Sequence, residues 1–224
     1  MPPIKYCIFD VIGTLFPWKD SFRFLNLLGG LGLKSGLSDQ ELNELCSSRI
    51  ESLFRSQEGF QDFIVEAYGV ELKETLGIIR RFDDLLISEA GLHPNAETTL
   101  RELAKGHCLL VCSDTTGSTK GMLEKARLRG YFQAEFYSNE MHVTKSGGLF
   151  RAILDSYPST RPEEFVSIGD SARSDIAVPK GMGMRTIWIR NEALGTFEVE
   201  PDIAVDDLGA VTRAVNILDR STTQ

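Results

Sequence analysis

The sequence lacks any apolar run that approaches the ~20 residues a helix needs to cross a bilayer. Its N-terminus also lacks a long apolar stretch followed by a cleavage site, so we expect no signal peptide. These two absences predict a cytoplasmic protein that does not bind membranes.

Positive charge is also scarce. The 224 residues include 24 lysines and arginines against 32 aspartates and glutamates, which gives a net charge of −8, and no long basic run occurs. This balance argues against nucleic acid as a partner. An anionic substrate would need a local positive site made of a metal ion, a lysine and backbone N–H groups.

Cysteines are few and scattered. The four of them form no CxxC pair of the kind that binds metal ions. Cys108 and Cys112 fall in a run with the composition of a buried strand, where a thiol acts as a small apolar side chain. The pattern favours free thiols in a reducing compartment.

What the chain does contain is a regular alternation of short apolar runs and amphipathic helical patterns. Such alternation predicts an α/β fold, a Rossmann-like parallel sheet with helices on both faces. The expected strands are 4–9, 108–112, 135–138, 165–169, 185–189 and an edge strand at 203–205. The expected helices are 96–105, 118–129, 148–156, 175–181 and a terminal helix striped from 208 to 218.

One long interruption separates the first two expected strands. Residues 18–90 far exceed the ~10–12 residues that a simple crossover needs. They show helical periodicity, and Ser38 with Glu41 has the pattern of a capping box. We therefore expect a helical cap domain at 18–90, inserted into a core domain formed by 1–17 and 91–224.

Acidic residues follow two of the apolar runs. Asp10 ends the first run and precedes a Gly-Thr turn, and Asp170 and Asp175 follow the run at 165–169. The carboxyl ends of parallel strands meet at one edge of a sheet, so these carboxylates can share a site. There they can act as a nucleophile or as Mg²⁺ ligands. The plainer alternative is a set of helix caps and solvated charges.

Two further groups could complete an anion site. Ser113 ends the run at 108–112 just before an expected helix, whose N-terminal N–H groups can bind an anion. Lys145 precedes another helix and could neutralise Asp10 and a bound phosphate. Taken alone, Ser113 is equally well explained as a helix N-cap, and Lys145 as a solvated surface charge.

The order of these signals is more specific than any one of them. An acid, a hydroxyl, a lysine and an acid pair follow one another along the chain. In this order of motifs the chain resembles the haloacid dehalogenase-like hydrolase superfamily, and the resemblance runs from Ile4 to about Leu218. The resemblance implies a core with strand order 5-4-1-2-3 and a helical cap inserted after the first motif.

The resemblance also implies roles. Asp10 would be the catalytic nucleophile, and Lys145 would steady it. Substrate would be bound by Thr14, Ser113, Asp114 and Lys145. Mg²⁺ would be bound by Asp10, the main-chain oxygen of Ile12, Asp170 and Asp175. The expected reaction is hydrolysis of a small phosphorylated metabolite through an aspartyl-phosphate, by a monomer or a homodimer.

One position departs from the resemblance. The phosphatases of this superfamily usually carry a second aspartate where this chain has Ile12, and that group protonates the leaving oxygen and then activates water. General acid–base catalysis contributes roughly 10²–10⁴-fold. We therefore expect weak hydrolysis of alkyl phosphates and a smaller loss with aryl phosphates, whose leaving groups need little protonation.

Two alternatives stay open. The first is a 2-haloacid dehalogenase that uses Asp10 on a small halogenated substrate. The second is a catalytically silent relative that binds a phosphorylated ligand or a partner protein. Arg23 and Arg49 of the cap could reach a substrate carboxylate, although a solvated helix arginine is the plainer interpretation.

Overall fold

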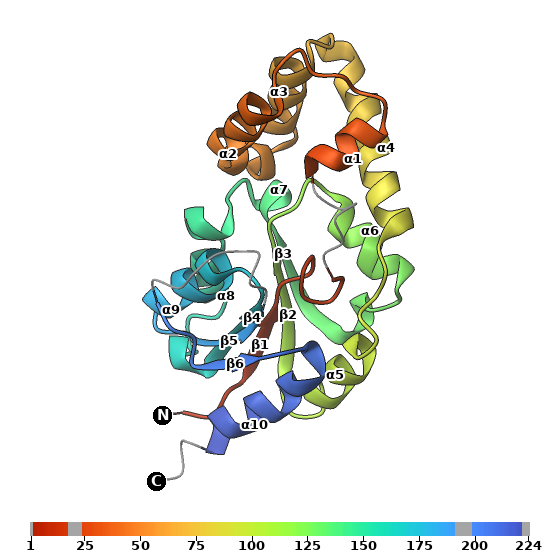
Figure 1. Ribbon diagram of the computed structural model, residues 1–224. Coiled ribbons are helices and arrows are strands. Elements are labelled where there is room, and N and C mark those ends of the chain that lie inside the picture. The colour runs from red at the N-terminus through yellow and green to blue at the C-terminus, as the bar shows by residue number, and fades with distance from the viewer. Residues whose placement is uncertain (1, 18–23, 191–198, 221–224) are drawn as a thin grey trace.

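A parallel sheet of six strands forms the centre of the protein (Figure 1). The computed structural model describes residues 2–17, 24–190 and 199–220. The strands are β1 (Tyr6–Phe9), β2 (Cys108–Ser113), β3 (Phe132–Tyr137), β4 (Phe165–Gly169), β5 (Arg185–Ile189) and β6 (Ile203–Val205). Their spatial order is β3-β2-β1-β4-β5-β6, and every neighbouring pair is parallel. The predicted order 5-4-1-2-3 is confirmed, with β6 added beyond β5.

Helices cover both faces of the sheet because side chains alternate along each strand. In β1, Cys7 and Phe9 belong to one apolar cluster and Ile8 belongs to the other. The first cluster is covered by α5 (Ala96–Leu103), α6 (Ser118–Lys125) and α10 (Val211–Arg220). The second is covered by α8 (Phe150–Ser156) and the neighbouring α9 (Val178–Gly181) (Figure 1).

Short helical turns make most of the connections in the core. They are η2 (Arg129–Tyr131), α7 (Ser138–Met141), η3 (Lys145–Leu149), η4 (Pro162–Glu164), η5 (Ala172–Ala177) and η7 (Leu208–Ala210). None of the helices in the described part of the chain has the length and apolarity to span a bilayer. The cytoplasmic location stays a prediction.

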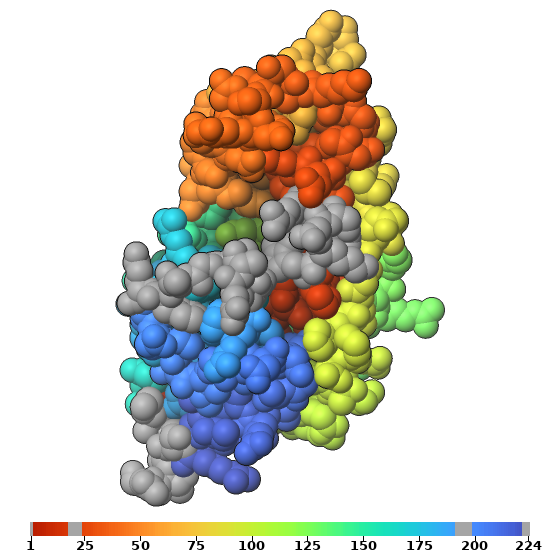
Figure 2. Space-filling view, in the orientation of Figure 1, coloured from red at the N-terminus to blue at the C-terminus, as the bar shows by residue number. Residues whose placement is uncertain are grey.

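The insertion between β1 and β2 is helical, as predicted. It comprises α1 (Phe24–Gly30), α2 (Asp39–Arg55), α3 (Gln57–Tyr68) and α4 (Leu72–Glu89). Ser38 and Glu41 form the predicted capping box at the start of α2. The ring of Phe24 lies 5.2 Å from both Phe60 and Phe82 between centroids, so aromatic packing holds the helices together. The helices form a lobe above the sheet edge (Figures 1 and 2). The domain bounds 18–90, and 1–17 with 91–224, stay a prediction.

Several predicted bounds were wrong for local reasons. The helix expected at 118–129 ends at Lys125, because Arg127 adopts a left-handed backbone with φ 58°. The helix expected from Gly148 begins regularly only at Phe150, because Gly148 has φ 132°. Cys108, expected to be buried, is exposed at the first position of β2, and only the later residues of that strand are covered.

Polar contacts link the cap helices to the core. Thr116 Oγ1 donates to Asp83 Oδ1 at 2.9 Å, and Ser138 Oγ donates to the main-chain oxygen of Phe54 at 2.7 Å. A third contact joins Thr144 to the carboxylate of Glu51. Burial raises the pKa of Asp83 to about 6, and the Thr116 hydrogen bond opposes this rise. The ionised form of Asp83 therefore destabilises the folded state.

An Asp83→Asn variant should be more stable than the native chain at pH 8 but not at pH 4. The folded-state pKa of about 6 lies above the ordinary value of 3.8, so the penalty develops as pH rises between these values and is complete above them. Asparagine keeps the acceptor for Thr116 without the charge. Because Asp83 is partly exposed, we expect a gain of about 1 kcal/mol in unfolding free energy, well below the ~2.7 kcal/mol of a two-unit shift.

Urea unfolding at the two pH values measures this gain. Asp62→Asn is the matched control, because Asp62 is an exposed aspartate on the neighbouring helix α3 and is not among the groups that shift the pKa of Asp83. Equal gains at pH 4 and pH 8 would show that the charge of Asp83 is not the cause.

Candidate active site

Strand β1 delivers Asp10 to the carboxyl edge of the sheet. The Asp10 N–H donates to the main-chain oxygen of Ile168 at 2.9 Å, which continues the pairing with β4. Gly13, at φ 97°, then allows the chain to turn back, and its N–H donates to the oxygen of Phe16 at 2.7 Å. Asp10 is thereby fixed at the strand end with only 7% of its surface exposed.

Lys145 reaches the same point from the loop before α8. Its Nζ lies 2.5 Å from Asp10 Oδ1 and 2.6 Å from Asp175 Oδ1, and the residue is 3% exposed. The main-chain N–H of Lys145 donates to Asp114 Oδ1 at 2.9 Å, which holds the start of this loop against the end of β2. The interpretation of Lys145 as a solvated surface charge is therefore wrong.

The acid pair follows β4. Ligand oxygens of Asp10, Asp170 and Asp175 lie within 4.8 Å of one another, and all three residues are buried. Asp175 Oδ2 accepts the N–H of Ser171 at 3.0 Å. A Cβ atom on Gly169 would come within 2.4 Å of the Asp175 carboxylate, so only glycine permits this approach. The alternative of solvated charges is wrong for these acids.

Burial dominates the electrostatics of the cluster. It raises the pKa of Asp10 to about 8, with Lys145 opposing the rise and the two other acids adding to it. Burial lowers the pKa of Lys145, but the carboxylates of Asp10 and Asp175 raise it well above its ordinary value. The ammonium is therefore charged at neutral pH and stabilises the ionised form of its partners.

The donor set fits a divalent cation. When ionised, the three acids and Lys145 carry a net of two negative charges in a buried space. A single divalent ion would balance this charge, and clustered carboxylate oxygens are the ligands that Mg²⁺ prefers. Asp10, Asp170 and Asp175 would hold it, while Ile12 lines the same cavity.

Of the predicted substrate-binding residues, Asp114 and Lys145 line the cavity over this cluster, whereas Thr14 and Ser113 do not. Thr14 Oγ1 donates to Asp10 Oδ2 at a long 3.4 Å. Ser113 Oγ is buried and has no hydrogen-bond partner within the described ranges. The helix after β2 begins at Ser118 with Gly117 as its N-cap, so the interpretation of Ser113 as that cap is wrong. Asp114 lines the cavity, and burial raises its pKa.

A cavity of about 340 Å³ lies over the cluster, between the cap helices and the core. Its cap side is made of Phe24 and of four apolar residues that sequence reasoning did not assign to the site: Ile50, Phe54, Phe82 and Leu86. The i, i+4 spacing of Ile50 with Phe54, and of Phe82 with Leu86, is the only signal the sequence offers for them. The core side adds hydroxyl residues that were also missed: Thr115, Thr116, Ser118, Ser171 and Ser174.

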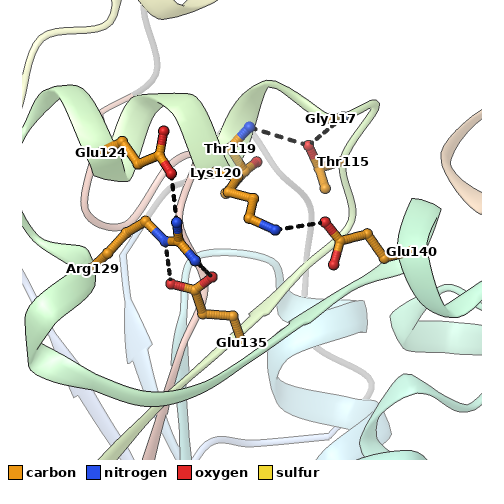
Figure 3. A network of polar contacts seen from close by, with 8 residues as sticks. All are labelled: Thr115, Gly117, Thr119, Lys120, Glu124, Arg129, Glu135 and Glu140. Atoms are coloured by element: carbon orange, nitrogen blue, oxygen red, sulfur yellow. Dashed lines mark hydrogen bonds and ion pairs between the residues drawn. The ribbon is translucent and has the colours of Figure 1, made fainter.

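Thr115 stands between this cavity and helix α6. Its hydroxyl accepts the N–H groups of Gly117 at 3.1 Å and Thr119 at 3.5 Å, so it holds the loop at the start of the helix (Figure 3). Arg129 in the same view pairs with two glutamates and does not line the cavity (Figure 3).

The cap arginines do not add a cation to the described lining. Arg49 is exposed and pairs with Glu66 at 2.9 Å, which agrees with the plainer interpretation of a surface arginine. Arg23 lies outside the described residues.

Comparisons with known proteins support one family. A HAD-hydrolase-like family model matches residues 145–211. The mitochondrial phosphatidylglycerophosphatase GEP4 of Saccharomyces cerevisiae is 30% identical over 103 residues, which are 42% of this chain. The alignment spans 52%, about half, of the length of that relative.

Solved structures share the fold over nearly the whole chain. The magnesium-bound putative HAD-hydrolase YfnB of Bacillus subtilis has a TM-score of 0.70 at 18% identity, covering 96% of this chain and 99% of its own. A 2-haloacid dehalogenase of Pseudomonas syringae pv. Tomato DC3000 has a TM-score of 0.67 at 19% identity, covering 96% and 98%. The chain is thus similar to HAD-like hydrolases in sequence over residues 145–211, and it shares the fold of HAD hydrolases over nearly its whole length.

Proposed function

We propose that the protein is a Mg²⁺-dependent phosphohydrolase that acts on a small phosphorylated metabolite through an aspartyl-phosphate on Asp10. One observation carries the proposal: the buried cluster in which Lys145 contacts Asp10 and Asp175, with Asp170 beside them. The similarity to a relative named a phosphatidylglycerophosphatase and to a magnesium-bound structural neighbour is consistent with it.

The reaction follows from the positions of these groups. Asp10 attacks phosphorus, a bond forms between its carboxylate oxygen and phosphorus, and the alcohol leaves as its alkoxide or phenoxide with the electron pair of the broken P–O bond and takes a proton from solvent. Water then attacks the phosphorus of the aspartyl-phosphate and loses a proton to solvent, which yields inorganic phosphate and restores the carboxylate. Asp10, Asp170 and Asp175 would hold Mg²⁺, which would supply positive charge for phosphate binding at an otherwise acidic site.

Three chain groups stabilise the transferring phosphoryl group in this proposal. Lys145 is already charged and fixed, so its orientation needs no reorganisation during the reaction. Ser113 does not line the cavity, but its buried hydroxyl has no partner among the described residues and would be a donor for a phosphate oxygen bound at the end of β2. Thr14 orients Asp10 through its hydrogen bond. The cap helices above the cavity limit the access of water.

A panel of phosphate esters, assayed with Mg²⁺ and with EDTA, tests the proposal. We expect phosphate release that requires Mg²⁺, is faster from aryl than from alkyl esters, and falls at least about 10-fold in Asp170→Asn because an ion ligand is weakened. Asp202→Asn is the matched control, because Asp202 lies on the far edge of the sheet beside β5 and β6. Equal rates with and without the metal would overturn the assignment.

Carbon–halogen cleavage by Asp10 is the second candidate. Ile12 favours it, since halide needs no proton on leaving, and one structural neighbour is named a 2-haloacid dehalogenase. It predicts halide release from a 2-haloacid in the presence of EDTA. Against it, Lys145 is the one cation that the described cavity lining offers to a substrate carboxylate, and it already contacts two aspartates.

A further inference from the structure

The cavity has two chemically different halves. The half toward the sheet is lined by the acid cluster, Lys145 and several serine and threonine residues. The half toward the cap is apolar throughout the described residues and comes from helices α1, α2 and α4. A phosphate ester bound with its phosphate at the acid cluster would place its alcohol against the cap, so it would contact both halves of the cavity.

The apolar half is built as a packed surface. Phe24 lies 5.2 Å from Phe82 and 6.3 Å from Phe54 between ring centroids. Phe82 is 1% exposed and therefore fixed by its neighbours, whereas Ile50 remains 41% exposed at the cavity edge. An apolar ligand bound against this surface is stabilised because its hydrocarbon is removed from water. A hydroxyl of a ligand would find no side-chain hydrogen-bond partner there.

The core adds one apolar residue to the same cavity. Ile12, two residues after Asp10, is among the lining residues, so hydrocarbon lines the cavity on the core side as well as on the cap side. A polyhydroxylated alcohol placed there would lose hydrogen bonds to water without replacing them.

We infer that the substrate of this site is the phosphate monoester of an apolar alcohol about the size of one ring, which packs against Phe24, Ile50, Phe54 and Phe82. The inference rests on the proposed function for its phosphate half. A volume of about 340 Å³ lies near the lower end of the 300–1,000 Å³ typical of small-molecule cavities, so a single ring fits and a diacyl lipid does not.

Phosphonates test this inference without turnover, because they lack the P–O ester bond that would be cleaved. Calorimetric titration in Mg²⁺ should show that benzylphosphonate binds roughly 10-fold to 100-fold more tightly than 2-hydroxyethylphosphonate, the gain expected from burying one ring. Equal affinities, or no binding of either compound, would overturn the inference.

Paired variants locate the effect. Ile50→Gln places an amide at the cavity edge and should reduce the preference for the benzyl compound at least about 3-fold. Leu76→Gln is the matched control, because Leu76 is 40% exposed on the cap but does not line the cavity, and it should leave the ratio unchanged. An equal effect of both variants would contradict the proposed contact.

Two further measurements distinguish a lipid from a small phosphate ester as the substrate, and separate the apolar binding site from the phosphohydrolase assignment. We expect no phosphate release from vesicles that contain phosphatidylglycerophosphate. Release of phosphate from these vesicles would overturn the inference of a ring-sized alcohol and indicate a lipid substrate. If benzylphosphonate is preferred but no aryl phosphate is hydrolysed, the apolar site stands and the phosphohydrolase assignment fails. If aryl phosphate is hydrolysed and the phosphonates bind equally, the reverse holds.

Discussion

Asp10→Asn should lower the rate of aryl phosphate hydrolysis by roughly 10⁴-fold or more, the scale of loss seen when a covalent nucleophile is removed. The amide has nearly the shape of the carboxylate but is a far weaker nucleophile. Lys145 keeps its contact with Asp175, so the remainder of the cluster can persist. Phosphate release from purified protein, followed over long incubations, measures the loss.

The comparison needs proof of folding and a matched substitution. Near-UV circular dichroism and the thermal midpoint should show that Asp10→Asn is folded. Asp155→Asn removes an exposed aspartate on α8 and should retain full activity. If Asp10→Asn hydrolyses aryl phosphate at the native rate, Asp10 is not the nucleophile, and the activity belongs to another site or another mechanism.

Ile12→Asp should raise alkyl phosphate hydrolysis by roughly 10²–10⁴-fold, because it restores a group able to protonate the leaving oxygen. The gain with aryl phosphates should be smaller, since their leaving groups depart with little protonation. Ile12 is only partly buried and already lines the cavity, so a carboxyl at this position can reach the ester. The ratio of alkyl to aryl turnover in the variant and the native chain measures the effect.

Ile12→Asn is the control for polarity alone. It introduces an amide of similar size that cannot transfer a proton at neutral pH, so the alkyl-to-aryl ratio should stay near the native value. A native chain that hydrolyses both ester classes equally fast, or an Ile12→Asp variant without any gain, would mean that another group supplies the proton.

The core of the site could be predicted because it depends on strand ends. The run at 165–169 is apolar, short and followed by Asp170, and the strand has these bounds in the structure. Since parallel strands present their carboxyl ends at one edge, residues 10 and 170 had to approach each other once β1 and β4 were neighbours.

The burial of Lys145 could not be read from its own surroundings. A lysine in a loop is a solvated charge unless distant residues enclose it, and its partners Asp10 and Asp175 are 135 and 30 residues away. The start of α6, in contrast, was predicted correctly at residue 118, so the interpretation of Ser113 as its N-cap could have been rejected from the sequence.

The cap side of the cavity could not be predicted for a different reason. Helical periodicity marks Ile50 and Phe54, or Phe82 and Leu86, as members of an apolar stripe, but a stripe does not reveal whether it faces its own helix bundle or another part of the fold. That depends on how the cap sits on the core, through contacts such as Asp83 with Thr116. The cap residues that line the cavity are thus the least visible in the sequence.

Transfer of the phosphoryl group to Asp10 can be observed directly. Native protein mixed with an aryl phosphate and Mg²⁺ is quenched in acid, and its peptides are analysed by mass spectrometry. Because Ile12 cannot activate water, the aspartyl-phosphate should break down slowly and accumulate, giving one phosphoryl group on the peptide that contains Asp10 and an equivalent burst of phenol. EDTA or Asp10→Asn should abolish both signals. Phosphorylation of a different residue, or steady phosphate release with Asp10 unmodified at every time point, would contradict the proposed mechanism.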